Sequence, residues 1–171
     1  MHTRVMADTR PMLRTVVRRR LRATRAEIFA DWTDPDRLDW YPNPDNRSRA
    51  TVPITVDLQV GGAWCVPMIV DGTTAYITGG VYREIQPNHL VRFAWGARPG
   101  WPDPDDGFEC ALVLRDAGAE TDLEFELSWA ANAGADIDVW PQCIAGWSTT
   151  IDRLVDRYAK EEAAHVVPGI S

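Results

Sequence analysis

The feature that most constrains the fold is a long amphipathic stretch near the end of the chain, from Cys143 to Tyr158. Its apolar residues recur at the spacing of one helix face: Ile144, Trp147, Ile151, Leu154, Val155 and Tyr158. Pro141 is tolerated only in a first helical turn and Asp138 is suited to cap it, so we expect a helix over residues 139–164. At 1.5 Å per residue it spans roughly 39 Å. A helix of this kind needs a broad apolar surface on which to lie.

The middle of the chain supplies that surface as strands. The clearest alternation is Thr121 to Trp129, where every second residue is apolar, so one face meets a core and the other meets water. Turn signals separate further strands, which we expect at 51–60, 63–70, 73–85, 90–95 and 108–115. We expect a tight turn at Gly61-Gly62, another at Asp71-Gly72, and a bulge or bend at Gly79-Gly80.

The N-terminal part predicts a strand followed by two short helices. Residues 14–23 alternate as a strand. Thr24 and Glu27 have the spacing of a capping box, which predicts that a helix begins there. Asp34-Pro35 ends this helix and begins a second one. The chain therefore predicts an α+β fold: a strand, two short helices, about six consecutive antiparallel strands and a long helix.

Charge argues against two classes of partner. The chain has a formal net charge of −7 and a pI near 4.9, which disfavours nucleic acid and anionic membranes. The only basic cluster lies between Arg14 and Arg25, and it alternates with apolar residues. We therefore expect a strand with a charged outer face there, and no nucleic-acid partner.

Length, cysteine usage and the chain ends constrain the domain organisation and the cellular compartment. A length of 171 residues with 45% apolar content favours one domain over 13–165, with flexible tails at 1–12 and 166–171. Cys65, Cys110 and Cys143 are too few and too far apart for a disulfide framework, so we expect buried thiols and a cytoplasmic protein. Neither a signal sequence nor a membrane span is expected.

Five segments, in this order, resemble the START/polyketide-cyclase (SRPBCC) superfamily, within its AHSA-type branch of homologues of the heat-shock chaperone ATPase activator. The first segment, Ala23 to Tyr41, holds the motif Trp32-Thr33-Asp34-Pro35. The others are Asp57 to Gly62, Gly80 to Ile85, Leu90 to Trp95 and Gly146 to Leu154. The sequence departs from the family pattern at Gln59, where arginine is usual, and in the long loop 96–107.

This resemblance implies the helix-grip fold of the birch pollen allergen. In that fold a curved antiparallel sheet of about six or seven strands wraps around a long C-terminal helix, and a pocket lies between them. The family name also implies a co-chaperone or stress-response role for some members. Because one fold hosts many functions, the resemblance by itself does not select among them.

Aromatic residues are the candidates for a pocket lining. The chain has 8 Trp against 4 Phe and 4 Tyr, and indoles suit a cavity that holds an apolar ligand with a few polar contacts. A densely packed core remains the alternative for each residue. The candidate lining is Trp40, Tyr41, Met68, Tyr82, Trp95, Phe125, Trp129, Trp147 and Ile151. Trp101, an apolar residue on the polar loop 96–107, is the candidate lid, with an ordinary long loop as the alternative.

Catalytic and metal sites have weaker support. Asp31, Asp39, Asp57 and Glu109 are acid/base candidates, but we expect ordinary surface charges at these positions. Asp57 and Tyr82 would be the proton-transfer groups if the pocket were catalytic. The three histidines, His2, His89 and His165, are not spaced as metal ligands, and no nucleotide-binding or nucleophile motif is present. We therefore expect neither a metal nor a cofactor.

Three hypotheses of function follow from these observations. The first is binding of a small apolar or aromatic molecule between sheet and helix. The second is a cyclase, aromatase or hydrolase that acts on a polyketide-like or other hydrophobic metabolite in the same cavity. The third is an interaction module with a chaperone as partner. The sequence leaves turnover undecided, and a homodimer is an open alternative to a monomer.

Overall fold

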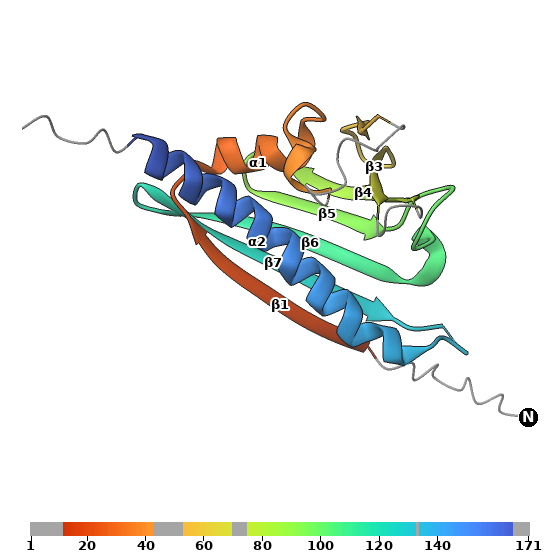
Figure 1. The fold of residues 1–171 in the computed structure, drawn as a ribbon. Helices are drawn as coiled ribbons and strands as arrows, with labels where there is room; N and C mark the ends of the chain where they lie inside the picture. Colours follow the sequence, from red (N-terminus) through yellow and green to blue (C-terminus); the bar gives the residue numbers. More distant parts are fainter. Residues whose placement is uncertain (1–11, 43–52, 70–74, 133, 166–171) are drawn as a thin grey trace, which may run out of the picture.

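The described residues form one curved antiparallel sheet that grips a long helix. The structure is a computed structural model that describes residues 12–42, 53–69, 75–132 and 134–165. In this part of the chain, seven strands are ordered β1-β7-β6-β5-β4-β3-β2. All pairs are antiparallel, and α2, Trp140–His165, runs across one face of the sheet (Figure 1). The α+β helix-grip architecture expected from the sequence is therefore confirmed.

Most element boundaries agree with the expected ones within two or three residues. The strands are β1 Met12–Leu21, β2 Thr55–Val56, β3 Ala63–Ile69, β4 Ala75–Gln86, β5 Leu90–Trp95, β6 Phe108–Ala117 and β7 Glu120–Ala130. The helices before α2 are α1 Arg25–Thr33 and three single 3-10 turns: η1 Leu38–Trp40, η3 Pro104–Asp106 and η4 Ile137–Val139. The expected tails, apart from Met12 in β1, and the expected Asp71-Gly72 turn lie outside the described residues.

The start of α1 is set by its capping box, as predicted. The Glu27 amide donates to the Thr24 hydroxyl at 3.2 Å, and the Thr24 amide donates to the Glu27 carboxylate at 2.7 Å. These bonds hold the pKa of Glu27 below its usual value. The bond from the Thr24 amide has the largest effect, and the bond with the Thr24 hydroxyl adds to it. The second short helix is only the 3-10 turn η1, because Asp34 accepts from the amide of Asp36 in a local turn.

The strand expected over 51–60 is wrong in extent. Of the described residues 53–60, only Thr55 and Val56 pair with β3 in the sheet. The Asp57 amide still donates to the Ala63 carbonyl at 2.9 Å, and beyond it the backbone bonds locally, with Gln59 donating to Asp57 and Gly62 donating to Gln59. Leu58 and Val60 are therefore exposed, at 43% and 67%, although their alternation suggested a buried face. The expected turn at Gly61-Gly62 is present, with Gly61 at φ +84°.

Gly79-Gly80 marks a close approach and not the expected bulge. Both glycines pair regularly with β3, and the register shifts later, between Tyr82 and Glu84. A Cβ on Gly80 would lie 2.5 Å from the Trp64 indole nitrogen and 2.7 Å from the Phe93 ring. Glycine is therefore needed here so that two aromatic side chains can cover the strand.

The basic segment is a strand with a charged outer face, as predicted. Arg18 and Arg20 lie directly opposite Glu124 and Asp122 in the register of β1 and β7. Arg18 donates to Glu124 at 3.0 Å, and Arg20 donates to Asp122 at 2.7 Å. Cross-strand pairs of opposite charge therefore cover this face of the sheet.

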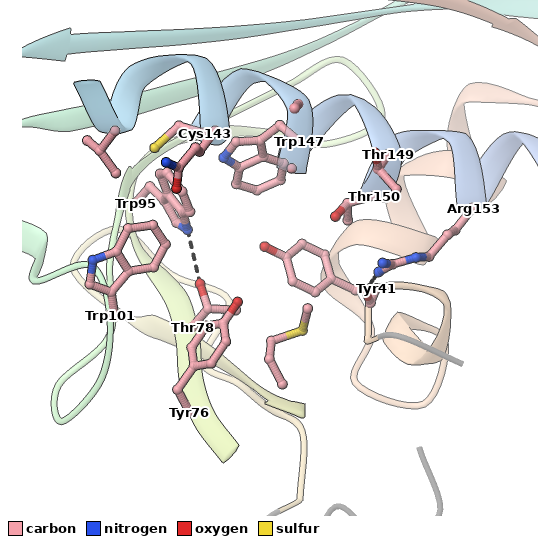
Figure 2. Close-up of a pocket in the computed structure, with 15 residues that line it drawn as sticks. Tyr41, Tyr76, Thr78, Trp95, Trp101, Cys143, Trp147, Thr149, Thr150 and Arg153 are labelled. Carbon is pink, nitrogen blue, oxygen red and sulfur yellow. Dashed lines mark hydrogen bonds between the residues drawn. The ribbon is translucent and has the colours of Figure 1, made fainter. Parts of the chain in front are cut away.

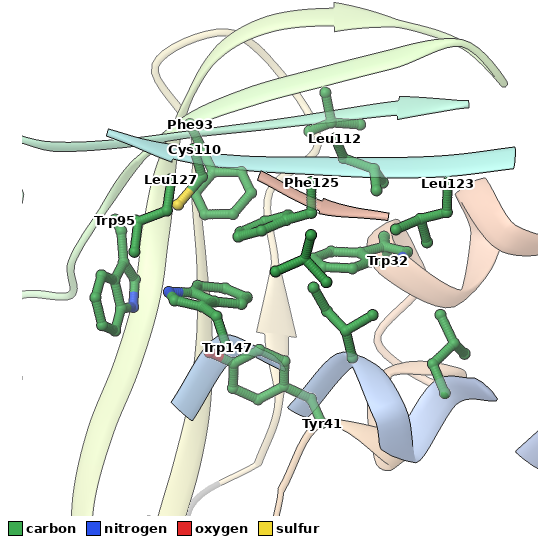
Figure 3. Close-up of a cluster of buried hydrophobic side chains, with 14 of the residues drawn as sticks. Trp32, Tyr41, Phe93, Trp95, Cys110, Leu112, Leu123, Phe125, Leu127 and Trp147 are labelled. Atoms are coloured by element: carbon green, nitrogen blue, oxygen red, sulfur yellow. The ribbon is translucent and has the colours of Figure 1, made fainter. Parts of the chain in front are cut away.

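The helix α2 closes the fold over an aromatic core. It begins after η4, which is capped by Asp136 and not by the expected Asp138, because the Asp136 carboxylate accepts from the Asp138 amide at 3.0 Å. Trp147 projects from α2 into the core, 4.4 Å from the Phe125 ring and 5.3 Å from the Trp95 ring between centroids (Figure 3). This indole is 3% exposed, so it joins the helix to the sheet.

A buried carboxylate joins α1 to the C-terminal half of α2, which contradicts the surface position expected for Asp31. Asp31 is 0% exposed. Its Oδ1 accepts a hydrogen bond from Arg37 Nε at 2.9 Å and forms an ion pair with Arg37 Nη2 at 2.7 Å, and its Oδ2 accepts from the Tyr158 hydroxyl. Burial raises the pKa of Asp31, and the bonds from Tyr158 and Arg37 oppose that effect. Of the other acid/base candidates, Asp57 is exposed, and the carboxylates of Glu109 and Asp39 are roughly half exposed.

Candidate ligand-binding cleft

A cleft of about 470 Å³ lies between α2 and the β3–β5 part of the sheet (Figure 2). Its sheet side is formed by side chains of Tyr41, Met68, Tyr76, Thr78, Trp95 and Trp101. Its helix side is formed by Val139, Gln142, Cys143, Ala145, Gly146, Trp147, Thr149, Thr150 and Arg153. Gln142, Ala145, Gly146 and Thr149 are exposed, so the cleft is open to solvent along the helix. Its volume is in the range of small-molecule sites.

One end of the cleft is aromatic. The Trp95 and Trp101 rings meet edge to face at 5.2 Å, and the Trp101 and Tyr76 rings at 6.3 Å. The indole nitrogen of Trp95 donates to the Thr78 hydroxyl at 3.0 Å, which fixes the orientation of that ring. Trp101 is 44% exposed, so this end offers an accessible apolar surface.

Two tyrosine hydroxyls lie between the aromatic end and Arg153. Burial raises the pKa of Tyr41, opposed by a hydrogen bond with Thr78 and by the charge of Arg153. Burial also raises the pKa of Tyr76. Both side chains are therefore neutral at pH 7 and present hydroxyl groups to the cleft. Burial raises the pKa of the Cys143 thiol to about 11, so this cysteine is a neutral part of the wall.

The other end of the cleft is cationic. Arg153 extends from α2 toward Tyr41 and donates from Nη1 to the Tyr41 carbonyl at 2.6 Å (Figure 2). Among the described lining residues it is the only charged side chain. Within the described ranges, no carboxylate lies at ion-pair distance from it. Asp152 instead pairs with Arg19 at 2.8 Å, and Asp39 pairs with Arg157 at 3.2 Å.

The structure brings four of the nine candidate lining residues to this cleft. These are Tyr41, Met68, Trp95 and Trp147. Phe125, Trp129, Tyr82 and Ile151 lie in the packed core, each at most 3% exposed. Trp40 also lies in the core and borders a separate surface groove with Arg153 and Arg157. Whether the four cleft residues bind a ligand stays a prediction.

The two candidate proton-transfer residues do not line the cleft. Tyr82 is 1% exposed, burial raises its pKa, and its hydroxyl has no hydrogen-bond partner among the described residues. Asp57 lies on the surface and accepts from the Gln59 side chain at 2.9 Å. The geometry therefore offers no support for catalysis by this pair, and the enzymatic hypothesis stays untested.

Trp101, the candidate lid, is held at the edge of the cleft by its backbone. Its amide donates to the Ile77 carbonyl of β4 at 2.9 Å. Ala97 donates to the Pro102 carbonyl at 2.9 Å across the same loop. The loop therefore adds Trp101 to the aromatic wall, while opening and closing of this loop stay a prediction.

Sequence reasoning missed the polar half of the cleft. Gln142, Thr149 and Arg153 alternate with the apolar residues of α2 and read as part of its solvated face. The exposed glycine at 146 was the available signal, because a missing side chain on a helix face can leave space beside it. A Cβ at Gly146 meets no atom within 4 Å.

Within the described part of the chain, no helix is long and apolar enough to span a bilayer. Among the same residues, no three His, Cys, Asp or Glu side chains gather in a way that could hold a metal ion.

Comparison with known families decides the classification. The model of the family described as "Activator of Hsp90 ATPase homolog 1-like protein" matches residues 22–159. The chain belongs to this AHSA1 family. The matched range contains α1, the six strands β2 to β7 and most of α2, so the AHSA-type resemblance is confirmed. A search of the curated proteins found no match to the sequence.

Solved structures share the fold of this AHSA1 family member at low identity. An AHSA1-like protein from Aeromonas hydrophila is 19% identical, with a TM-score of 0.64 over 93% of this chain and 100% of that one. The Aha1 dimer from Colwellia psychrerythraea is 16% identical, with a TM-score of 0.61 over 85% and 96%. An HSP90 activator from Plasmodium falciparum is 19% identical, with a TM-score of 0.54 over 80% and 88%.

Proposed function

We propose that this protein binds a small aromatic or otherwise apolar molecule in the cleft between α2 and the sheet. The main support for this proposal is the cleft of about 470 Å³, whose wall includes Trp95 and the accessible Trp101. Large aromatic side chains exposed beside a concave space lower their free energy when a ligand covers them. The neutral hydroxyls of Tyr41 and Tyr76 supply the few polar contacts that orient a bound molecule.

Gly146 makes a direct test possible. It lines the cleft, and a Cβ there would enter open space. Gly146→Phe places a ring in the cleft, whereas Gly146→Ala adds one methyl group and removes a helix-interior glycine. We expect Gly146→Ala to raise the free energy of unfolding by up to about 1 kcal/mol, measured by urea denaturation.

Binding is measured with N-phenyl-1-naphthylamine, a neutral probe that becomes fluorescent in apolar sites. We expect saturable binding to the wild type and to Gly146→Ala, and at least a tenfold loss of affinity in Gly146→Phe. Equal binding to all three proteins would place the probe elsewhere and contradict the proposal. A circular dichroism melt of each variant confirms that the fold is intact.

A co-chaperone role is the second candidate. It is supported by the description of the family and by the Plasmodium falciparum relative, which is an HSP90 activator. The test is the ATPase rate of a purified Hsp90-type chaperone with and without this protein. A concentration-dependent increase supports the role, and an unchanged rate at saturating protein argues against it.

A homodimer is proposed on narrower grounds. The Colwellia psychrerythraea relative was solved as a dimer, and its identity of 16% transfers the fold alone. Sedimentation velocity at several concentrations decides between a monomer and a dimer of this chain.

A further inference from the structure

The cleft has two chemically different ends, and this asymmetry restricts what it can hold. Trp95 and Trp101 lie at one end and Arg153 at the other, with Tyr41 between them in the view of Figure 2. Planar indoles favour an aromatic group at their end. A ligand that satisfies both ends must be aromatic on one side and polar on the other.

Arg153 has unused donor capacity. Its Nη1 donates to the Tyr41 carbonyl at 2.6 Å, and that bond is the only one it makes within the described residues. A guanidinium carries five N–H donors in a planar fork, which matches the two oxygens of a carboxylate. The Tyr41 bond holds the side chain in place, so less conformational entropy is lost when a ligand binds to the remaining donors.

The surrounding charges favour an anion at this point. Asp152, next to Arg153 on α2, pairs with Arg19, and Asp39 of η1 pairs with Arg157. Asp156 borders the neighbouring surface groove with Arg153 but not the cleft, and it is not within ion-pair distance of Arg153 in the described structure. Arg157 follows Arg153 by one helical turn, and its charge is taken up by Asp39 and Glu161, at 3.2 and 3.6 Å. In a chain of net charge −7, the described lining of the cleft carries only positive charge. A half-buried cation without a counter-ion is a costly arrangement that a bound anion would relieve.

We infer that the molecule held in this cleft is a small aromatic carboxylate, with its carboxylate on Arg153 and its ring against Trp95 and Trp101. This inference rests on the proposed binding function. It adds the sign and the position of the ligand's charge. Its distinctive consequence is a preference for a carboxylate over a neutral molecule of the same shape.

The test compares 2-naphthoate with 2-naphthamide by isothermal titration calorimetry. The two molecules have nearly the same shape and differ in charge at pH 7. We expect the wild type to bind naphthoate about tenfold more tightly than naphthamide, as for one charge-assisted contact. In Arg153→Gln this preference should vanish, while the affinity for naphthamide stays within twofold of the wild type.

Lys160→Gln is the matched control. It removes one positive charge from the exposed face of α2, two turns beyond Arg153 and outside the cleft. It should retain the preference for naphthoate. If Lys160→Gln reduces the preference as much as Arg153→Gln, the effect is a long-range one and the inference is wrong. Should Arg153→Gln not fold, Arg153→Met replaces it because it also removes the charge while keeping an unbranched side chain, and retention of the preference in that variant overturns the inference.

The outcomes separate this inference from the proposed function. If naphthamide binds the wild type and naphthoate binds no better, the cleft is a binding site, but the inferred preference for a carboxylate is wrong. If Arg153→Gln weakens both molecules equally, Arg153 shapes the cleft and does not read charge, which also overturns the inference. If neither molecule binds and the neutral naphthylamine probe also fails, both proposals fail together.

Discussion

At the scale of single residues, Asp31 shows most clearly how a polar side chain can organise an apolar fold. Its carboxylate is fully buried, yet both oxygens accept hydrogen bonds, from Arg37 and from Tyr158. The main-chain carbonyl of Asp31 also accepts from the indole of Trp40 at 2.8 Å. One residue thereby fixes α1, η1 and the C-terminal half of α2 relative to one another. Burial of a charge is tolerated because its partners replace water.

The pH dependence of stability tests this arrangement. Because the pKa of Asp31 is raised in the folded state, its protonated form is favoured there more than in the unfolded chain. Its stabilising contribution is therefore full below about pH 4, the unfolded pKa, and is lost as the pH rises through the folded pKa. We expect the free energy of unfolding of the wild type, relative to Asp31→Asn, to increase as the pH falls from 7 to 4.

Urea denaturation of both proteins at several pH values measures this difference. The comparison with Asp31→Asn removes the contribution of the other carboxylates, such as Glu27, whose pKa is lowered and whose stabilisation is lost at low pH. A difference that does not change between pH 7 and 4, or that falls, would contradict the raised pKa of Asp31.

At the scale of elements, α2 combines two tasks along one helix. Trp147 and Ile151 are buried against the sheet. Gly146 and Thr149, on neighbouring positions, border the open cleft. The helix can do both because side chains 100° apart around its axis face different surroundings. Anchoring by the buried stripe is what holds Arg153 at the end of the cleft.

Truncation of the Trp147 side chain tests how strongly the buried stripe anchors α2 to the sheet. Its ring packs 4.4 Å from Phe125 and 5.7 Å from Tyr41 between centroids, so Trp147→Ala removes a large contact area and leaves a cavity. We expect the free energy of unfolding to fall by roughly 3–5 kcal/mol in guanidinium denaturation. A loss well below this range would mean that water and the open cleft already occupy much of the space around the indole.

A matched control for this variant is Trp101→Ala. Trp101 is also an indole on the cleft wall, but it is 44% exposed and belongs to a surface loop. Its truncation should cost much less stability than that of Trp147 in the same denaturation measurement, since nearly half of the Trp101 surface already faces solvent.

At the scale of the whole molecule, one sheet serves as the platform for every other element. The strands β1 and β7 carry cross-strand ion pairs outside and apolar side chains inside. The strands β3 to β5 give the sheet side of the cleft. Because α2 packs across the sheet and α1 is tied to α2 through Asp31, the described part of the chain has no separate core that could unfold alone.

This continuity predicts a single cooperative unfolding transition. Trp fluorescence reports the aromatic core and the cleft, while far-ultraviolet circular dichroism reports the sheet and the helices. We expect the two signals to give the same urea midpoint within error. Two separated midpoints would show that α2 or the β2–β3 edge melts independently of the sheet.

The sequence alone determined the class of fold and most of the elements, for reasons that are local. Periodicity of 3.6 in α2, alternation in β7 and the capping box of α1 are properties of adjacent residues, and all were confirmed. The extent of β2 was not predictable, because its alternation continues past Val56 while local turn bonds replace strand pairing after Asp57. The bulge after Tyr82 likewise gave no sequence signal, whereas Gly79-Gly80 gave a misleading one.

Only the tertiary structure decided which aromatic residues border a space and which fill the core. Tyr41 and Tyr82 were equal candidates for the lining by residue type, but one reaches the cleft and the other is buried with its hydroxyl unpaired in the described structure. The burial of Asp31 and the position of Arg153 depend on contacts more than 100 positions apart in the chain. Such contacts depend on how helix and sheet meet, and no local pattern encodes the volume left between them.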